Sequence, residues 1–168
     1  MEPDLQRLVD EADIRRLLGR YARAIDRLDW ELLRSCYHPG AVDEHGSFRG
    51  TIDEFVPWVQ ERLAEYDWTK HFLGNQLIEL DGDTAWSETY CLAFHRVPAA
   101  DGRGPLDRLI NVRYVDRLER RDGEWRIAHR LTVYGPGRVD PVVEEPQTTP
   151  LHILFARDRS DPAYRRDF

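Results

Sequence analysis

The chain has 168 residues, of which 41% are hydrophobic and 11% aromatic, which suits one compact domain with a sizeable core. Its acidic and basic side chains are interspersed and give a net charge of −7, which argues against nucleic acid and membranes as partners. Residues 1–30 form a charged amphipathic segment, and no segment approaches the roughly 20 apolar residues of a membrane span, so we expect a cytoplasmic protein.

The first part of the chain predicts a helical hairpin. Apolar residues recur at helical spacing over Asp13–Leu28 and form one stripe, with arginines outside it. Asp29 suits the N-cap of a short second helix over Trp30–Tyr37, and His38-Pro39-Gly40 would end that helix because proline cannot continue it.

A third helix is expected after the hairpin. Thr51 and Glu54 have the spacing of a capping box, and apolar residues follow at helical intervals. Pro57 lies inside this segment, so we expect the helix to start one turn later or to bend there.

After Asp67 the pattern changes to strands rich in β-branched and aromatic residues, with Asp-Gly turns between the first and second and between the third and fourth. The four strands are expected over His71–Leu80, Thr84–Val97, Arg108–Glu119 and Glu124–Tyr134. Helices followed by long antiparallel strands predict an α+β fold, with the helices packed on one face of a curved sheet.

Residues 1–138 are expected to form this domain, and residues 139–168 a C-terminal arm. The arm is rich in proline and charged residues and has one apolar island over Leu151–Phe155. We expect the arm to pack on the domain, where it would cover a pocket, or on a neighbouring subunit. An open sheet face and free sheet edges also favour a homo-oligomer, and the family resemblance described below implies a dimer or a trimer.

Signals for a thiol, metal or nucleophilic-serine site are weak. Cys36 and Cys91 lie in apolar-rich stretches and are expected to be reduced, buried thiols. The histidines show no zinc-like spacing, and no serine lies in a Gly-x-Ser-x-Gly elbow. We therefore expect no metal and no cofactor, and any chemistry would be proton transfer.

Asp26 and His71 are the candidates for that chemistry. Asp26 falls at the edge of the apolar stripe of the first helix, and His71 opens the first long strand among apolar neighbours. A carboxylate bonded to one imidazole nitrogen would fix the tautomer and leave the other nitrogen as a general base. Taken singly, each residue also fits a structural role, Asp26 as a solvated or capping residue and His71 as a satisfied core histidine.

Three segments together resemble the SnoaL-like domain family of the nuclear transport factor 2-like superfamily. They are Tyr21-Ala-Arg-Ala-Ile-Asp26, the strand start at His71, and the stretch from Arg113 to Arg130 that contains Asp-Gly-Glu-Trp125. The resemblance covers about residues 8–135. It implies a cone-shaped, cystatin-like α+β barrel in which a curved, mostly antiparallel sheet wraps around the N-terminal helices.

The resemblance also implies a catalytic site. Asp26 and His71 match the catalytic Asp–His pair of dehydratases and dehydrochlorinases in the family. Tyr21 matches a tyrosine of the dehydratase members, and Arg130 matches an arginine that assists departure of the leaving group. His95 and Asn111 match two pocket residues of a dehydratase by spacing alone.

Aromatic side chains are expected to line a pocket for a flat apolar ligand. Many of them would be plain core residues, and the strand register decides which of them and which of His95 and Asn111 face inward. The residues expected to bind substrate in addition to His95 and Asn111 are Phe55, Trp58, Phe72 and Tyr90.

These observations predict a cofactor-independent lyase, a dehydratase acting on a small hydrophobic cyclic substrate of polyketide, steroid or terpenoid type with a carbonyl that acidifies the departing proton. His71 would be the base, Asp26 its orienting group, Tyr21 a donor to the carbonyl oxygen, and Arg130 a group assisting the departing hydroxyl. A polyketide cyclase or a ketosteroid-type isomerase needs the same base. A non-catalytic binding or assembly module of the same fold is the third possibility.

Overall fold

The computed structural model describes residues 3–143 and 148–165. These residues form three α-helices, six strands and one short 3₁₀ helix, with the α-helices before the four long strands as the sequence pattern predicts. In chain order the elements are α1 (Pro3–Asp26), α2 (Trp30–Ser35), β1 (Tyr37–His45), β2 (Phe48–Thr51), α3 (Ile52–Leu63), β3 (Trp68–Asp81), β4 (Thr84–Val97), β5 (Leu106–Arg121), β6 (Glu124–Pro141) and the 3₁₀ helix Pro162–Tyr164.

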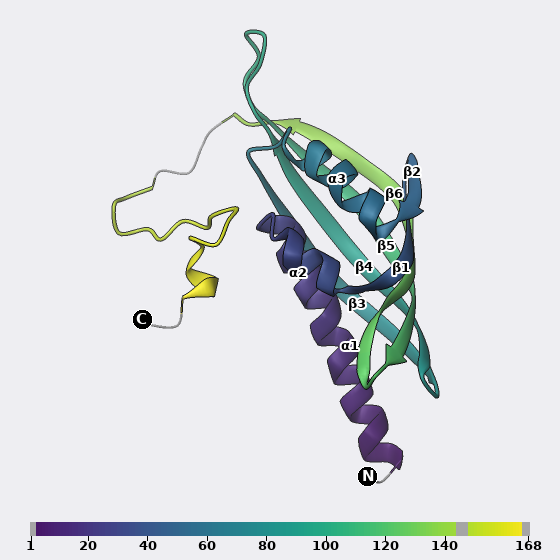
Figure 1. Cartoon of the computed structure of the whole chain (residues 1–168). Helices are drawn as coiled ribbons and strands as arrows, with labels where there is room; N and C mark the ends of the chain where they lie inside the picture. Colours follow the sequence, from purple (N-terminus) through teal and green to yellow (C-terminus); the bar gives the residue numbers. More distant parts are fainter. Residues whose placement is uncertain (1–2, 144–147, 166–168) are drawn as a thin grey trace.

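The strands form one sheet in the order β2-β1-β6-β5-β4-β3, in which only β1 and β6 run parallel. Figure 1 shows the long strands curving past the helices, with α1 and α3 on the same side of the sheet. The predicted α+β class and the curved, mostly antiparallel sheet are confirmed.

The core lies between this concave face and the helices. The apolar stripe of α1 is buried as predicted, since Ile14, Leu18 and Ile25 are each at most 2% exposed. On the sheet, residues alternate between buried and accessible along β4 and β5, as expected when only one face is covered. Buried side chains of both α1 and α3 form this core with the sheet, and a cavity remains between the two helices and the strands.

The sequence prediction missed β1 and β2 and extended the second helix too far. α2 ends at Ser35, and His38-Pro39-Gly40 lies within β1, where pairing with β6 shifts register between Tyr37 and Val42. Because the ladder is interrupted at this point, proline is tolerated, and Gly40 takes a φ of +74°. The residues expected to end the helix therefore belong to an irregular strand.

The expected delay in the third helix is wrong. α3 begins directly after Thr51, whose side chain and backbone form the capping box with Glu54, and the helix continues through Pro57. Pro57 and Asp53, whose carbonyl loses its helical partner, are both exposed, so water can satisfy that carbonyl.

All four predicted strands are present, and three are longer than expected. β6 continues to Pro141, seven residues past its predicted end at Tyr134. Gly137 permits this extension, because a Cβ atom at that position would lie 2.7 Å from the carbonyl oxygen of Leu109 on β5. The sheet is therefore extended through a segment whose Gly-Pro-Gly composition indicates a loop.

The described part of the arm packs on the end of α1 and on the connection from α3 to β3. Asp161 pairs with Arg27 at 3.0 Å, next to the end of α1. Arg157 donates to the carbonyl oxygens of Leu63, at 3.1 Å, and of Tyr66. No helix within residues 3–143 and 148–165 combines the length and the apolar character that a membrane crossing needs.

Candidate active site

The end of α1 places a carboxylate against the first long strand. The helix stops because Leu28 takes a left-handed φ of +52°, and Asp29 N–H closes the final turn on the carbonyl of Ala24 at 2.9 Å. A leucine in this conformation is strained, a feature that clusters at functional sites. Asp26 is the last residue of α1, and its side chain faces β3.

Three donors from β3 hold the Asp26 carboxylate. Oδ1 accepts from Thr69 Oγ1 at 3.0 Å, and it lies 2.8 Å from His71 Nδ1. Oδ2 accepts from the backbone N–H of His71 at 2.9 Å. Because the carboxylate accepts a hydrogen bond from the Nδ1–H group, the proton stays on Nδ1, and the other ring nitrogen of His71, Nε2, is left as an acceptor. The expected Asp26–His71 pair is thus a hydrogen-bonded unit.

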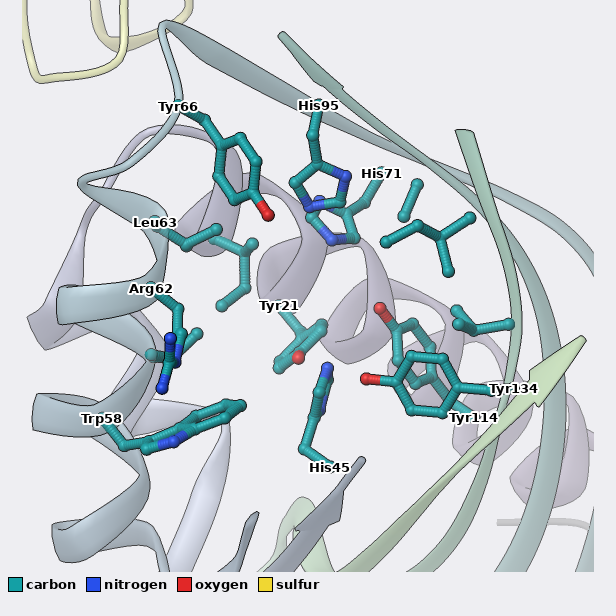
Figure 2. Close-up of a pocket in the computed structure, with 15 residues that line it drawn as sticks. Tyr21, His45, Trp58, Arg62, Leu63, Tyr66, His71, His95, Tyr114 and Tyr134 are labelled. Carbon is teal, nitrogen blue, oxygen red and sulfur yellow. The ribbon is translucent and has the colours of Figure 1, made fainter. Parts of the chain in front are cut away.

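His71 opens into a cavity of about 170 Å³ that Figure 2 shows in close-up. The cavity lies between α1, α3, β1 and the concave face of β3 to β6, and most of its lining is apolar or aromatic. Trp58 and Leu63 line it from α3, and Ile110 and Val112 from β5. A dyad at the wall of such a cavity combines a proton acceptor with a surface that binds apolar molecules.

Three tyrosine hydroxyls converge on the same space. Tyr21 comes from α1, Tyr114 from β5 and Tyr134 from β6, and Figure 2 shows them between His71 and the far side of the cavity. Burial raises the pKa of Tyr21 and of Tyr114 well above the usual value, and it raises the pKa of Tyr134 to about 12. All three therefore stay protonated near neutral pH and can donate hydrogen bonds to a developing oxyanion.

His95 also lines the cavity, as expected. Its ring is 5.6 Å from that of His71 between centroids and 4.7 Å from that of Tyr66. Burial, and then the charge of a protonated His71, lowers the pKa of His95 to about 4. His95 is therefore neutral at physiological pH, and its Nδ1 atom has no hydrogen-bond partner among the described residues.

Arg130 occupies a different place from the one expected for a group that touches a leaving group. Its side chain is fully buried behind the cavity, where Nε and Nη2 pair with the two carboxylate oxygens of Asp116, each at 2.7 Å. The guanidinium carbon lies 3.9 Å from the ring centroid of Tyr21 and 4.1 Å from that of Tyr114. Arg130 thus positions two cavity tyrosines by cation–π contact and does not line the cavity itself.

Three of the expected substrate-binding residues lie on the outer face of the sheet. Phe72 and Tyr90 are 56% and 48% exposed, and Asn111 donates to the carbonyl of Pro136. Side chains alternate between faces along a strand, and the cavity side is taken by the neighbours of these residues, His71 and Val112 among them.

Of the two α3 residues expected to bind substrate, one lines the cavity and the other belongs to the core. Trp58 lines the cavity, whereas Phe55 is fully buried behind it and packs against Trp58 with ring centroids 5.9 Å apart.

Sequence reasoning missed His45, which lines the cavity from β1 opposite His71. It also missed Tyr66, Tyr114 and Tyr134. The signal for His45 was an alternating Asp43-x-His45 pair, which becomes visible only when residues 37–45 are assigned to a strand.

In the part of the chain that the structure describes, the cysteines and the potential metal ligands do not gather into a site. Cys36 and Cys91 are free and buried, and burial raises the pKa of these thiols to about 11 and about 12. Within the described residues, no three His, Cys, Asp or Glu side chains are grouped so that they could hold a metal ion.

The chain belongs to the SnoaL-like domain family, whose model matches residues 6–131. This confirms the family indicated by the sequence. An uncharacterized protein of Mycobacterium tuberculosis is 29% identical over 125 residues, which are 73% of this chain and 83% of that protein.

Solved structures with the same fold include two enzymes by name. The hexachlorocyclohexane dehydrochlorinase LinA-type3 of Novosphingobium barchaimii has a TM-score of 0.72 and 20% identity, with 88% of this chain and 99% of that chain covered. A Novosphingobium aromaticivorans protein provisionally named a scytalone dehydratase has a TM-score of 0.70 and 18% identity, with 84% and 97% covered. At these identities the likeness shows the fold alone, which is of the nuclear transport factor 2-like kind.

Proposed function

We propose that this protein is a cofactor-independent dehydratase that removes water from a hydrophobic cyclic β-hydroxycarbonyl compound. The observation that carries the proposal is the 2.8 Å contact between Asp26 Oδ1 and His71 Nδ1 at the wall of an apolar cavity. An oriented imidazole facing a water-poor space is a suitable general base for a proton next to a carbonyl.

The roles of the residues follow from their positions. His71 Nε2 takes the proton, and Asp26 stabilises the imidazolium that forms. Tyr21, and with it Tyr114, donates to the carbonyl oxygen, on which negative charge develops. Arg130 keeps these two phenol rings in place through its contacts of 3.9 and 4.1 Å.

The size of the cavity narrows the substrate class. Its volume of about 170 Å³ lies below the range of about 300–1,000 Å³ that is usual for pockets holding drug-sized ligands. Among polyketide, steroid and terpenoid compounds, a substrate of one or two fused rings fits this space better than a four-ring steroid.

The relatives support an elimination reaction. A dehydrochlorinase removes a proton and a leaving group from neighbouring carbon atoms, and a dehydratase does the same with hydroxyl as the leaving group. A cyclase or isomerase would use the same base without a leaving group. A ligand-binding module would use the cavity but would not need the oriented imidazole, and an assembly module would need neither.

The test uses the β-hydroxy derivative of α-tetralone, a two-ring ketone that becomes α-naphthol on dehydration. We expect the protein to catalyse naphthol formation, followed by absorbance, and we expect His71→Gln to lower kcat by about 10²–10⁴-fold. Asp26→Asn should give a loss in the same direction, because an amide cannot stabilise the imidazolium as a carboxylate does.

A matched control is His129→Gln, since His129 pairs with Glu44 at 2.9 Å away from the cavity lining. Its rate should equal that of the wild type. Deuterium uptake next to the carbonyl without any naphthol would favour the isomerase instead. Equal activity of the wild type and His71→Gln would refute the role of His71 as the general base.

A further inference from the structure

The cavity has a second Asp–His pair on the wall opposite His71. Asp43 and His45 are two residues apart on β1, so both side chains point to the inner face of the sheet. His45 Nδ1 lies 3.4 Å from Asp43 Oδ1 and 3.1 Å from Thr132 Oγ1. Figure 2 shows the His45 ring directed into the cavity, with Tyr134 beside it and Tyr21 between it and His71.

The carboxylate of this second pair is completely buried, with a side-chain exposure of 0%. Its Oδ2 atom accepts a hydrogen bond of 2.6 Å from the hydroxyl of Tyr37. Its Oδ1 atom has no hydrogen-bond partner among the described residues, although a buried carboxylate oxygen is costly to leave unpaired. A proton on Nδ1 of His45, which lies 3.4 Å away, can satisfy it.

The buried charges near Asp43 leave His45 as the partner that can balance its charge. Asp43 and Asp116 are both buried, and the one buried guanidinium beside them, that of Arg130, pairs with Asp116 through both carboxylate oxygens. The His45 ring is the other group in contact with Asp43 that can carry a positive charge. With the Nδ1 proton held by Asp43, a protonated His45 presents its second proton, on Nε2, to the cavity.

The ring of His45 is fixed by aromatic packing. Its centroid lies 5.5 Å from that of Phe55, 6.1 Å from that of Trp58, and 6.1 Å from that of Tyr134, which meets it edge-on. A side chain packed on three aromatic rings loses little further freedom when a substrate binds, which general acid catalysis requires.

We propose that His45 is the general acid of the elimination and that Asp43 is its positioning residue. This inference rests on the proposed function and adds the group that protonates the leaving hydroxyl. His71 Nε2 gains the proton as the C–H bond breaks, and that electron pair forms the C=C bond through the enolate. The C–O bond breaks with its pair on oxygen, which takes the proton of His45 Nε2 and leaves as water. The reaction starts with His71 neutral and His45 protonated and ends with the reverse.

The test separates proton removal from loss of the hydroxyl with two probes. α-Tetralone in D₂O reports the base alone, through deuterium uptake next to the carbonyl. Its β-hydroxy derivative reports base and acid together, through α-naphthol. We expect His45→Gln to slow naphthol formation by at least about 100-fold while deuterium uptake stays within about threefold of the wild type.

A variant of the positioning residue gives a second readout. Asp43→Asn, which keeps the size of the side chain, should give a smaller loss of the same kind, and it carries the test if His45→Gln does not fold. His71→Gln should lose both reactions.

The outcomes distinguish this inference from the function beneath it. A wild type that catalyses neither reaction refutes the proposed function, and the role of His45 with it. Suppose instead that the wild type catalyses both reactions. If His45→Gln then loses both equally, or loses neither, His45 is not the general acid, and the proposed dehydratase function is unaffected.

Discussion

The two sides of the cavity hold their histidines in different ways. On one side, called here the His71 wall, the carboxylate of Asp26 is 16% exposed and receives three hydrogen bonds, two of them from His71 itself. On the other side, the His45 wall, the carboxylate of Asp43 is fully buried and contacts His45 at a longer distance, 3.4 Å.

This difference suits two different tasks. The His71 wall fixes both the backbone and the ring of its histidine, so the accepting nitrogen has one position. The His45 wall relies on a buried carboxylate and on aromatic packing, so its histidine is tied to the charge balance of the core. Both tasks need a placed side chain, but proton removal needs a free acceptor nitrogen, whereas loss of the hydroxyl needs a proton donor.

The largest effect is expected from the core charges behind the His45 wall. Asp116→Ala leaves the fully buried Arg130 without its partner, which should lower the free energy of unfolding by about 3–5 kcal/mol. Urea denaturation measures this change. The freed guanidinium would also be drawn to Asp43, so naphthol formation should suffer more than deuterium uptake.

The matched control removes an exposed ion pair. Asp13 pairs with Arg16 on the surface of α1 at 2.8 Å, and Asp13→Ala should change stability little. A double variant, Asp116→Leu with Arg130→Met, should recover much of the loss because no unpaired charge remains. If Asp116→Ala is as stable as Asp13→Ala, the buried network does not support the His45 wall.

A smaller effect is expected from pH on the His71 wall. His95 has its pKa lowered from 6.5 to about 4 by burial and by the charge of His71. The unfolded chain therefore binds a proton at this residue before the folded chain does, and stability should fall as the pH drops from about 6.5 towards 4. At pH 5 this effect of His95 lowers the free energy of unfolding by roughly 2 kcal/mol relative to its value above pH 7.

His95→Gln removes this titration. We expect its unfolding free energy to change less between pH 7 and pH 5 than that of the wild type, measured by urea denaturation at both values. His152, on the exposed part of the arm, offers a control, since His152→Gln should keep the wild-type slope. A wild-type slope in His95→Gln would show that other groups cause the acid sensitivity.

The sequence was sufficient to predict the His71 wall but not the His45 wall. Asp26 lies on a long periodic helix and His71 on a long strand, so local patterns and the family resemblance agreed on both residues. Asp43 and His45 lie on β1, whose Pro39 and Gly40 look like a helix end and a turn. Pairing with β6, a strand more than 80 residues later, is what makes this segment a strand.

Strand register explains most of the remaining differences. Phe72, Tyr90 and Asn111 are each one position from a residue that faces inward, and composition alone does not say which face of a sheet is covered. Arg130 was recognised as an important residue, but its pairing with Asp116 and the resulting burial depend on two strands coming together. Its role behind Tyr21 follows only from three-dimensional contacts.

The smallest effect concerns the arm, which contacts the His71 side of the cavity. Arg157 donates to the carbonyls of Leu63 and Tyr66, and both of these residues line the cavity. Arg157→Ala should lower the free energy of unfolding by about 1 kcal/mol, because buried carbonyls lose a charged donor, and it should raise KM more than it lowers kcat. Arg159, 66% exposed and bonded to Asp29 and Glu31, is the matched control. If Arg157→Ala and Arg159→Ala behave alike in both measurements, the arm does not brace this wall, and the two sides of the cavity differ only in how their carboxylates are held.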